Sequence, residues 1–254
     1  MKLRLLGAGT SSGVPRIGND WGACDPGEPR NRRTRASLLV ETGETRLLID
    51  TSPDMREQLN AANVGNIDAV IWTHDHADHT HGIDDLRQIY HARGEPVPGY
   101  ARPETLRAVT TKFRYVFAGN DGYPPTVAGA PLPDEITIGD LQLRVADQPH
   151  GAIQSAGLRF ERDGKSAGYA TDFNDLTDNM QMLYQGLDLW IVDALRVRPH
   201  PSHPTLDQVI GWADLLRPKR TVLMHMDQSM DYRSLCNTLP HGIEPGYDGM
   251  EIQL

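Results

Sequence analysis

Short apolar runs separated by turn-forming residues predict a chain that alternates between strands and helices. Runs rich in β-branched and aliphatic residues, bounded by Gly, Asp or Asn, are typical of strands. The first half contains the predicted strands Leu3–Leu6, Ala36–Glu41, Arg46–Asp50 and Ala69–Trp72. The second half contains the predicted strands Glu135–Ile138, Leu141–Asp147, Leu158–Arg162, Ser166–Thr171, Leu187–Asp193 and Thr221–Met224. The pattern therefore indicates two strand-rich halves.

Apolar residues that recur at every third or fourth position predict helices between these strands. The expected helices are Met55–Ala62, Gly82–Tyr90, Pro103–Tyr115 and Leu206–Leu216. The Gly- and Pro-rich stretch Ala118–Pro133 shows neither the alternation of a strand nor the spacing of a helix. We expect a loop there, at the rim of a site. Because no internal repeat or linker interrupts the pattern, the sequence predicts one domain over residues 1–254.

The densest cluster of residues that could bind a metal directly follows the apolar run Ala69–Trp72. His74, His76, Asp78 and His79 place three imidazoles and a carboxylate within six residues. If the strand continues through His74, then His74 and His76 point the same way, because strand side chains alternate between faces. Asp78 and His79 would then lie in the turn that follows. This spacing predicts a site for divalent ions with nitrogen and oxygen ligands.

Three later residues, His150, Asp172 and His225, each lie just beyond a predicted strand. A lone histidine is more often structural than functional, so each of them alone is a weak signal. Loops at strand ends are nevertheless where functional residues concentrate, and together the three extend the cluster. His200 and His203 lie in a Pro-rich stretch. They are either candidate proton donors or incidental histidines of a surface loop.

Composition narrows the partners of the predicted site. The formal net charge of −9 over 254 residues argues against a polynucleotide partner, which usually meets a basic face, but it leaves a small phosphate ester possible. The basic run Arg30–Arg35 is either a solvated loop or a contact for substrate phosphate. Cys24 and Cys236 cannot build a multi-bridge framework, so we expect a reducing cytoplasm. Because the apolar runs are far too short to span a bilayer, we expect no membrane partner.

The motif from His74 to His79, with its preceding strand, resembles that of the metallo-β-lactamase superfamily. The resemblance implies an α/β fold of four layers, an αββα sandwich, with two metal ions, Zn²⁺ or Mn²⁺, at the edge between the sheets. It assigns the ligands as His74, His76 and His150 for one ion, Asp78, His79 and His225 for the other, and Asp172 as the bridge. Two such ions can share a water as a bridging hydroxide that attacks the substrate. Asp50 ends a predicted strand near the site and is a candidate to orient a metal-bound imidazole, and these relatives often place an aspartate at this position.

A narrower resemblance runs essentially end to end. Gly7–Pro15, Ile49-Asp50, Thr171-Asp172 and especially Gly246–Ile252 are similar to segments of the phosphoribosyl cyclic phosphodiesterase of the carbon–phosphorus lyase pathway. This resemblance implies hydrolysis of a cyclic phosphate of ribose or a nucleotide, and it makes a homodimer plausible. Asp78 and Asp172 would take part in catalysis together with a leaving-group proton donor. His203 matches the position of that donor, and His200 is second.

One departure from that family affects a second metal site. Family members carry an additional zinc bound by closely spaced cysteines and a later histidine. Here the corresponding stretch has only Cys24, and the later position is Gln228. One thiol and one amide cannot build the sulfur-rich tetrahedral site that structural zinc prefers. We therefore expect this additional site to be absent.

Several other functions fit the same residues. Thioester, lactone or β-lactam hydrolysis could use the same metals, because a fold does not fix a function. A tRNA 3′-processing endonuclease needs a long protruding arm, and the predicted hairpin already occupies the chain between His150 and Asp172. An inactive binding protein would be expected to lack some ligands, whereas every predicted ligand is present.

Overall fold

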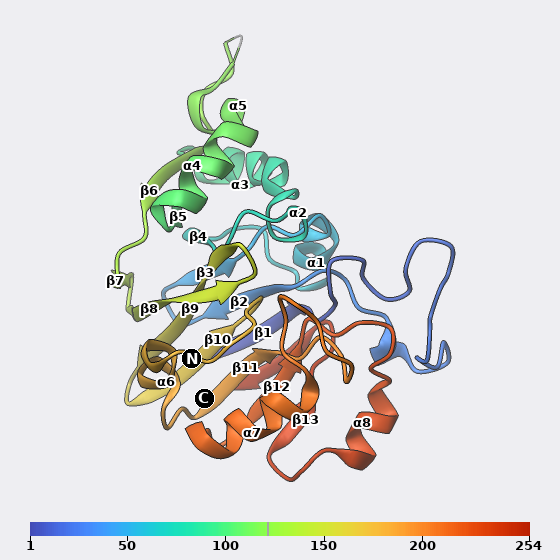
Figure 1. The fold of residues 1–254 in the computed structure, drawn as a ribbon. Coiled ribbons are helices and arrows are strands. Elements are labelled where there is room, and N and C mark those ends of the chain that lie inside the picture. The colour runs from blue at the N-terminus through green and yellow to red at the C-terminus, as the bar shows by residue number, and fades with distance from the viewer. Residues whose placement is uncertain (121) are drawn as a thin grey trace.

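Two seven-stranded sheets form the centre of the molecule, in a computed structural model that describes residues 1–120 and 122–254 (Figure 1). The first sheet has the order β14-β1-β2-β3-β4-β5-β6 and the second the order β13-β12-β11-β10-β9-β8-β7. The strands of the first sheet are β1 (Lys2–Gly7), β2 (Ser37–Glu41), β3 (Arg46–Ile49), β4 (Ala69–Trp72), β5 (Val97–Ala101), β6 (Val127–Pro131) and β14 (Met250–Gln253). Those of the second are β7 (Glu135–Ile138), β8 (Leu141–His150), β9 (Ile153–Arg162), β10 (Lys165–Ala170), β11 (Leu189–Asp193), β12 (Thr221–Met224) and β13 (Ile243–Pro245).

Helices cover the outer face of each sheet. The first half of the chain contributes α1 (Met55–Ala61), α2 (Ala77–Thr80), α3 (Leu86–Arg93), α4 (Pro103–Lys112) and α5 (Arg114–Ala118), with short 3₁₀ helices at Pro29–Asn31 and Ile83–Asp85. The second half contributes α6 (Asp178–Tyr184), α7 (Leu206–Leu216) and α8 (Tyr232–Thr238). None of the helices within residues 1–120 and 122–254 combines the length and apolar character needed to cross a bilayer.

The layers follow from strands that are buried on both faces. In β11, Leu189 and Ile191 pack between the two sheets, whereas Trp190 and Val192 pack beneath the helices of the second half. Residues of β4 divide in the same alternating way between the central core and the helices of the first half. Side chains alternate along a strand, so a strand covered on both sides is apolar throughout. The predicted αββα sandwich is therefore confirmed, and we keep one domain over residues 1–254 as a prediction.

The direction of the strands decides where a site can form. Strands β3 to β6 pair in parallel in the first sheet, and β10 to β13 pair in parallel in the second. The carboxyl ends of parallel strands share one edge of a sheet, and residues just beyond them gather there. The predicted ligands follow β4, β10 and β12 or end β8, so the fold brings distant parts of the chain together.

Most predicted elements have bounds within a few residues of those observed, and three expectations are corrected. Strand β4 ends at Trp72, so His74 and His76 lie in the following loop and not on a continuing strand. The helix expected at Pro103–Tyr115 breaks at Phe113 into α4 and α5. The expected loop Ala118–Pro133 contains β6, whose parallel pairing with β5 outweighs its Gly and Pro content; residue 121 in that stretch lies outside the described residues. Strand β5 was not predicted, because Pro and Gly conceal it.

Candidate metal centre

The Asp172 carboxylate lies at the centre of the predicted ligand cluster. Its Oδ2 atom is 3.6 Å from His74 Nε2 and 3.7 Å from His150 Nε2. Its Oδ1 atom is 3.3 Å from His79 Nε2 and 3.4 Å from His225 Nε2. Each oxygen therefore faces a different pair of imidazoles, which is the arrangement expected of a bridging carboxylate.

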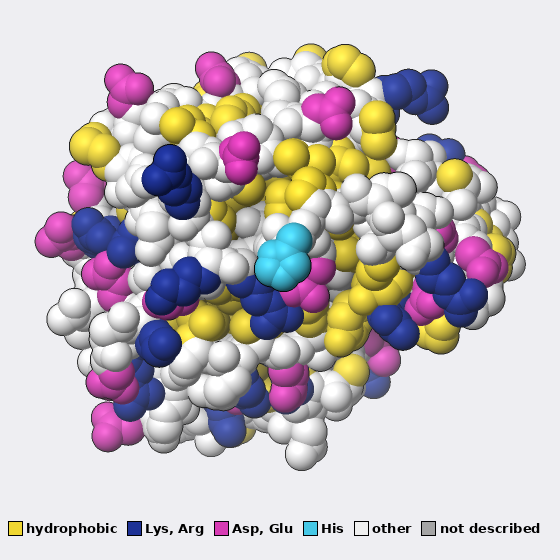
Figure 2. Space-filling view, turned by 90° about the horizontal axis from the view of Figure 1, so that it is seen from below, with side chains coloured by type: hydrophobic (Ala, Val, Ile, Leu, Met, Phe, Trp, Pro, Cys, Tyr) yellow, Lys and Arg dark blue, Asp and Glu magenta, His cyan; other side chains and the backbone are white. Residues whose placement is uncertain are grey.

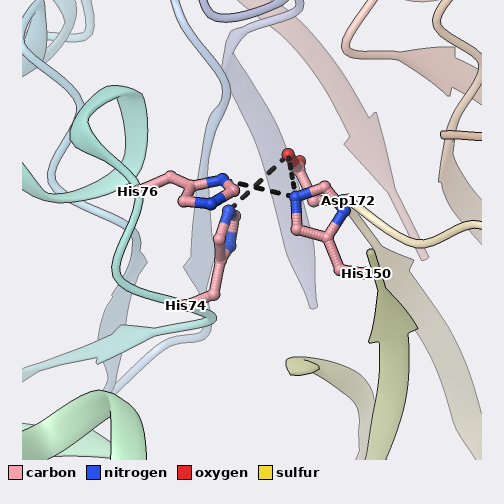
Figure 3. Close-up of side chains that lie close together, drawn as sticks. All are labelled: His74, His76, His150 and Asp172. Atoms are coloured by element: carbon pink, nitrogen blue, oxygen red, sulfur yellow. Dashed lines mark hydrogen bonds and ion pairs between the residues drawn. The ribbon is translucent and has the colours of Figure 1, made fainter. Parts of the chain in front are cut away.

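The first ligand group joins the loop after β4 to the end of β8 (Figure 3). His76 Nδ1 lies 3.3 Å from His150 Nε2, and both rings point toward His74 and Asp172. The candidate ligand atoms of these four residues all lie within 4.8 Å of one another. His76 is exposed whereas the other three are buried, so the group is accessible on the His76 side.

The second ligand group lies on the other side of Asp172. Asp78 and His79 are neighbours in the short helix α2, and Asp78 Oδ2 is 3.3 Å from His79 Nε2. The same oxygen is 3.5 Å from the Nε2 atom of His225, which follows β12. The structure thus brings together every ligand predicted from the sequence, although α2 carries Asp78 and His79 where a turn was expected.

Buried polar atoms in this cluster test whether two cations fit. His74 Nε2, Asp78 Oδ2, His79 Nε2 and His225 Nε2 are buried and find no hydrogen-bond partner among the described residues. Leaving such atoms unsatisfied costs about 1–3 kcal/mol each. All of them face the space around Asp172, where metal ions would satisfy them. A donor set of imidazoles and carboxylates without thiolate suits Zn²⁺ or Mn²⁺.

Charge in the cluster keeps the Asp172 carboxylate ionised. Burial favours the neutral acid of Asp172, but His225, His79 and His74 outweigh it and hold its pKa well below the ordinary value. Burial opposes protonation of His225, yet Asp172, Asp193 and Asp78 raise its pKa to about 9. Protons therefore occupy the second group when no cation does. Metal binding must displace these protons, as is general for such sites.

Asp50 contacts the imidazole of His79 in the second group, as expected from the sequence. Its Oδ2 atom lies 2.7 Å from His79 Nδ1 and accepts a hydrogen bond of 2.8 Å from Thr73 Oγ1. Its Oδ1 atom accepts a hydrogen bond of 2.7 Å from Thr73 N. A carboxylate that accepts from Nδ1 fixes the imidazole orientation and leaves Nε2 free to bind a metal.

We expect Asp50→Asn to weaken metal binding by about 10–100-fold, because the amide NH₂ would then face one of the donors, either Thr73 N or His79 Nδ1, that a carboxylate oxygen now accepts from. The affinity is measured by competition with a chelator of known strength. Asp68→Asn is the matched control. Asp68 lies just before β4 and accepts a hydrogen bond from the backbone N–H of Arg46 in β3, away from the candidate ligands. Equal affinities for Asp50→Asn and the wild type would contradict this role.

His203 lies beside the cluster, and a residue not predicted from the sequence holds it there. His203 Nδ1 is 2.7 Å from Asp193 Oδ2, and His203 Nε2 is 3.9 Å from Asp172 Oδ2. Asp193 Oδ1 also lies 3.7 Å from His225 Nδ1. Asp193 ends the buried strand β11, and its position at a strand end was the one available signal in the sequence. Of the two candidate proton donors, His203 directly approaches the cluster, whereas His200 contacts Ser202.

Three residues of the site adopt a left-handed backbone conformation one or two residues after their strands end. Asp50, Asp172 and His225 have φ angles of 62°, 50° and 56°. Positive φ is uncommon for residues other than glycine and concentrates at functional sites, where the surrounding structure enforces it. These turns bring the side chains back over the edge of each sheet.

The basic run is partly structural. Arg33 is buried and donates to the carbonyl oxygens of Met230, at 2.6 Å, and Asp227, at 3.3 Å. Arg35 pairs with Asp54 at 3.0 Å. The interpretation of the whole run as a solvated loop is therefore wrong for Arg33, because its buried guanidinium binds the backbone just beyond His225.

A family model described as a beta-lactamase superfamily domain matches residues 45–226. A crystal structure of a diphosphatase from the PhnP family is 35% identical, with a TM-score of 0.91, and the match covers 100% of this chain and 97% of that one. This chain belongs to the β-lactamase superfamily. Within that superfamily it is close to the PhnP family, in agreement with the narrower resemblance in the sequence.

Two other proteins are similar to this chain. An octanoyltransferase of Porphyromonas gingivalis is 35% identical over 262 residues, which cover 99% of this chain and 51% of that protein. This chain thus spans about half the length of that relative. The structure of Zn²⁺-bound PqqB from Methylobacterium extorquens has a TM-score of 0.81 at 20% identity, which shows the shared fold. The chain therefore has the superfamily domain, and its His and Asp clusters could hold metal ions.

Proposed function

We propose that this chain is a two-metal phosphodiesterase that opens cyclic phosphates of ribose or nucleotides. The observation that carries the proposal is the placement of Asp172 between two imidazole groups, with His203 beside it. The residues fit two cations that would polarise a phosphoryl group and lower the pKa of a shared water.

The chain itself supplies proton transfer to the leaving group. Asp193 accepts from His203 Nδ1, which fixes the ring and directs Nε2 toward the cluster. A protonated Nε2 there can donate to an oxygen that departs from phosphorus. Asp193 lies 3.7 Å from His225 as well, so one carboxylate links the proton donor to a ligand.

A small phosphate ester suits the charge of this chain better than a polynucleotide does. Figure 2 shows basic and acidic side chains interspersed over the one face in view, without a continuous basic stripe there. A protein that binds a polynucleotide usually carries such a stripe, and the net charge of −9 is a second argument against a polynucleotide partner. Both cysteines are free, which supports the cytoplasmic location that we propose.

A diphosphate is the second candidate substrate. The PhnP-family relative with 35% identity is named a diphosphatase, and it aligns with the whole of this chain. A phosphoanhydride and a cyclic phosphodiester share a phosphoryl centre that two cations can polarise, but they differ in leaving group. When a diphosphate is hydrolysed, the leaving group is a phosphate, which depends less on a proton donor than an alcohol leaving group does.

The test is a panel of substrates incubated with Mn²⁺- or Zn²⁺-loaded protein, with a chelated sample as control. We expect metal-dependent hydrolysis to be fastest with a ribose cyclic phosphate. Faster hydrolysis of a nucleoside diphosphate ester would favour the second candidate. The panel also contains a lactone and an octanoyl thioester, the latter because one relative is an octanoyltransferase. Preference for either of these would overturn the proposal.

A further inference from the structure

The C-terminal segment Gly246–Ile252 contains a carboxylate that the proposed reaction does not use. Asp248 lies in the turn between β13 and β14 and is partly buried. Its Oδ1 atom accepts a 2.9 Å hydrogen bond from Ala8 N. Its Oδ2 atom accepts hydrogen bonds of 2.7 Å from Thr34 N and 2.6 Å from Thr34 Oγ1. One side chain thus joins three segments that are far apart in the sequence.

Ala8 connects this carboxylate to a predicted metal ligand. The carbonyl oxygen of Ala8 accepts a 3.0 Å hydrogen bond from Met226 N, and Thr10 N donates to Met226 O at 3.3 Å. Met226 is fully buried and directly follows His225. The backbone at His225 has a φ of 56°, a conformation that its surroundings must enforce. The loop held by Asp248 is part of those surroundings.

Close packing leaves the loop little freedom to shift. Gly9 N donates to Thr34 O at 2.8 Å, so the two segments bound by Asp248 also bond to each other. A Cβ atom at Gly9 would lie 2.8 Å from Thr34 O and 2.9 Å from Arg33 Cβ, closer than side chains tolerate. The carboxylate therefore holds both segments beside Met226.

We propose that Asp248 is a positioning residue for His225, acting through Ala8 and Met226. This inference rests on the proposed function, because it takes the cluster to be a two-metal site. It predicts an effect on one metal position only. The group of Asp78, His79 and His225 depends on this support. The other group is supported elsewhere: Thr73 Oγ1 lies 3.1 Å from His74 Nδ1, and His150 Nδ1 lies 2.8 Å from Ser202 O.

The opposing explanation is that Asp248 only stabilises the fold. Burial raises the pKa of Asp248 to about 6, against the hydrogen bonds from Thr34 and Ala8. Removing the carboxylate would leave several donors without a partner, so some loss of stability is expected in either case. The experiment must therefore separate the two metal positions.

Asp248→Asn is the informative variant, because it keeps the side-chain shape but directs an N–H group at backbone donors. Mn²⁺ is titrated into metal-free protein by calorimetry, which resolves the two binding events. We expect one event to weaken about tenfold or more, while the other stays within about twofold of wild type. His225→Ala and His76→Ala identify which event belongs to which group, and Asp248→Asn should affect the His225 event.

Glu251→Gln is the matched control, because Glu251 lies in the same segment and pairs with Arg4 at the surface. It should leave both binding events unchanged. Equal weakening of both events by Asp248→Asn, or no weakening of either, would overturn the inference. If the wild type bound fewer than two ions, the proposed function itself would fail, and that result is distinct from the failure of Asp248→Asn alone.

Discussion

Replacing Asp172 by alanine is expected to reduce turnover of a cyclic phosphate by about a thousandfold or more. Asp172 faces two imidazoles with each oxygen, so its removal takes a ligand from both metal positions at once. Metal content should fall with activity. Both are measured on the same preparation, by steady-state kinetics and by elemental analysis of the desalted protein.

Two further variants separate this loss from misfolding. Asp172→Asn keeps the volume and tolerates the φ of 50°, yet removes the charge, so we expect a loss nearly as large. Asp188→Ala is the control, because Asp188 precedes the other end of β11 and pairs with Lys219 at 2.7 Å. Ser155 Oγ donates to the Asp172 carbonyl at 2.8 Å and helps to hold the turn in every variant. Activity of Asp172→Ala within about tenfold of wild type would contradict a bridging role.

Replacing His203 by alanine is expected to lower turnover in a manner that depends on the leaving group. For an alkoxide leaving group, such as a ribose hydroxyl, we expect a loss of about 10²–10⁴-fold, because a positioned proton donor contributes that much. The leaving group of an activated aryl ester departs without a proton, so the rate of its hydrolysis should fall far less. Rates are compared across a series of phosphodiesters with leaving groups of increasing acidity.

His241→Ala serves as the control, because His241 is exposed between α8 and β13. Asp193→Asn should reproduce part of the His203→Ala effect, since the amide holds the ring at Nδ1 less strongly. Equal losses on alkyl and aryl esters would show that His203 supports the site without donating a proton. Metal affinity should change little in His203→Ala, which distinguishes it from a ligand variant.

The cluster of candidate ligands could be predicted from the sequence because most of its residues follow strands that the apolar pattern identifies. Val70 and Trp72 pack under helices while Ala69 and Ile71 pack between the sheets, so the strand before the motif is apolar throughout. Such a run is visible without a structure. His225 follows β12 and Asp172 follows β10, two strands buried over most of their length, and parallel pairing of both with β11 brings the strand ends together.

Residues whose role depends on contacts between distant segments could not be predicted. Asp193 ends a buried strand like the ligands, but its pairing with His203 depends on how a Pro-rich loop folds back over β11. Asp248 contacts Ala8 and Thr34, and no local pattern indicates a contact across more than two hundred positions. Strand β6 could not be predicted for a similar reason, because its pairing with β5 determines its structure more than its own composition does.

The central claim is that hydrolysis requires two cations at this cluster. The most direct measurement is to add Mn²⁺ stepwise to metal-free protein and to follow hydrolysis of a ribose cyclic phosphate against the number of bound ions per chain. We expect little turnover with one ion bound and a steep rise as the second position fills. Full turnover at one ion per chain, or turnover that persists in the chelated protein, would contradict the claim.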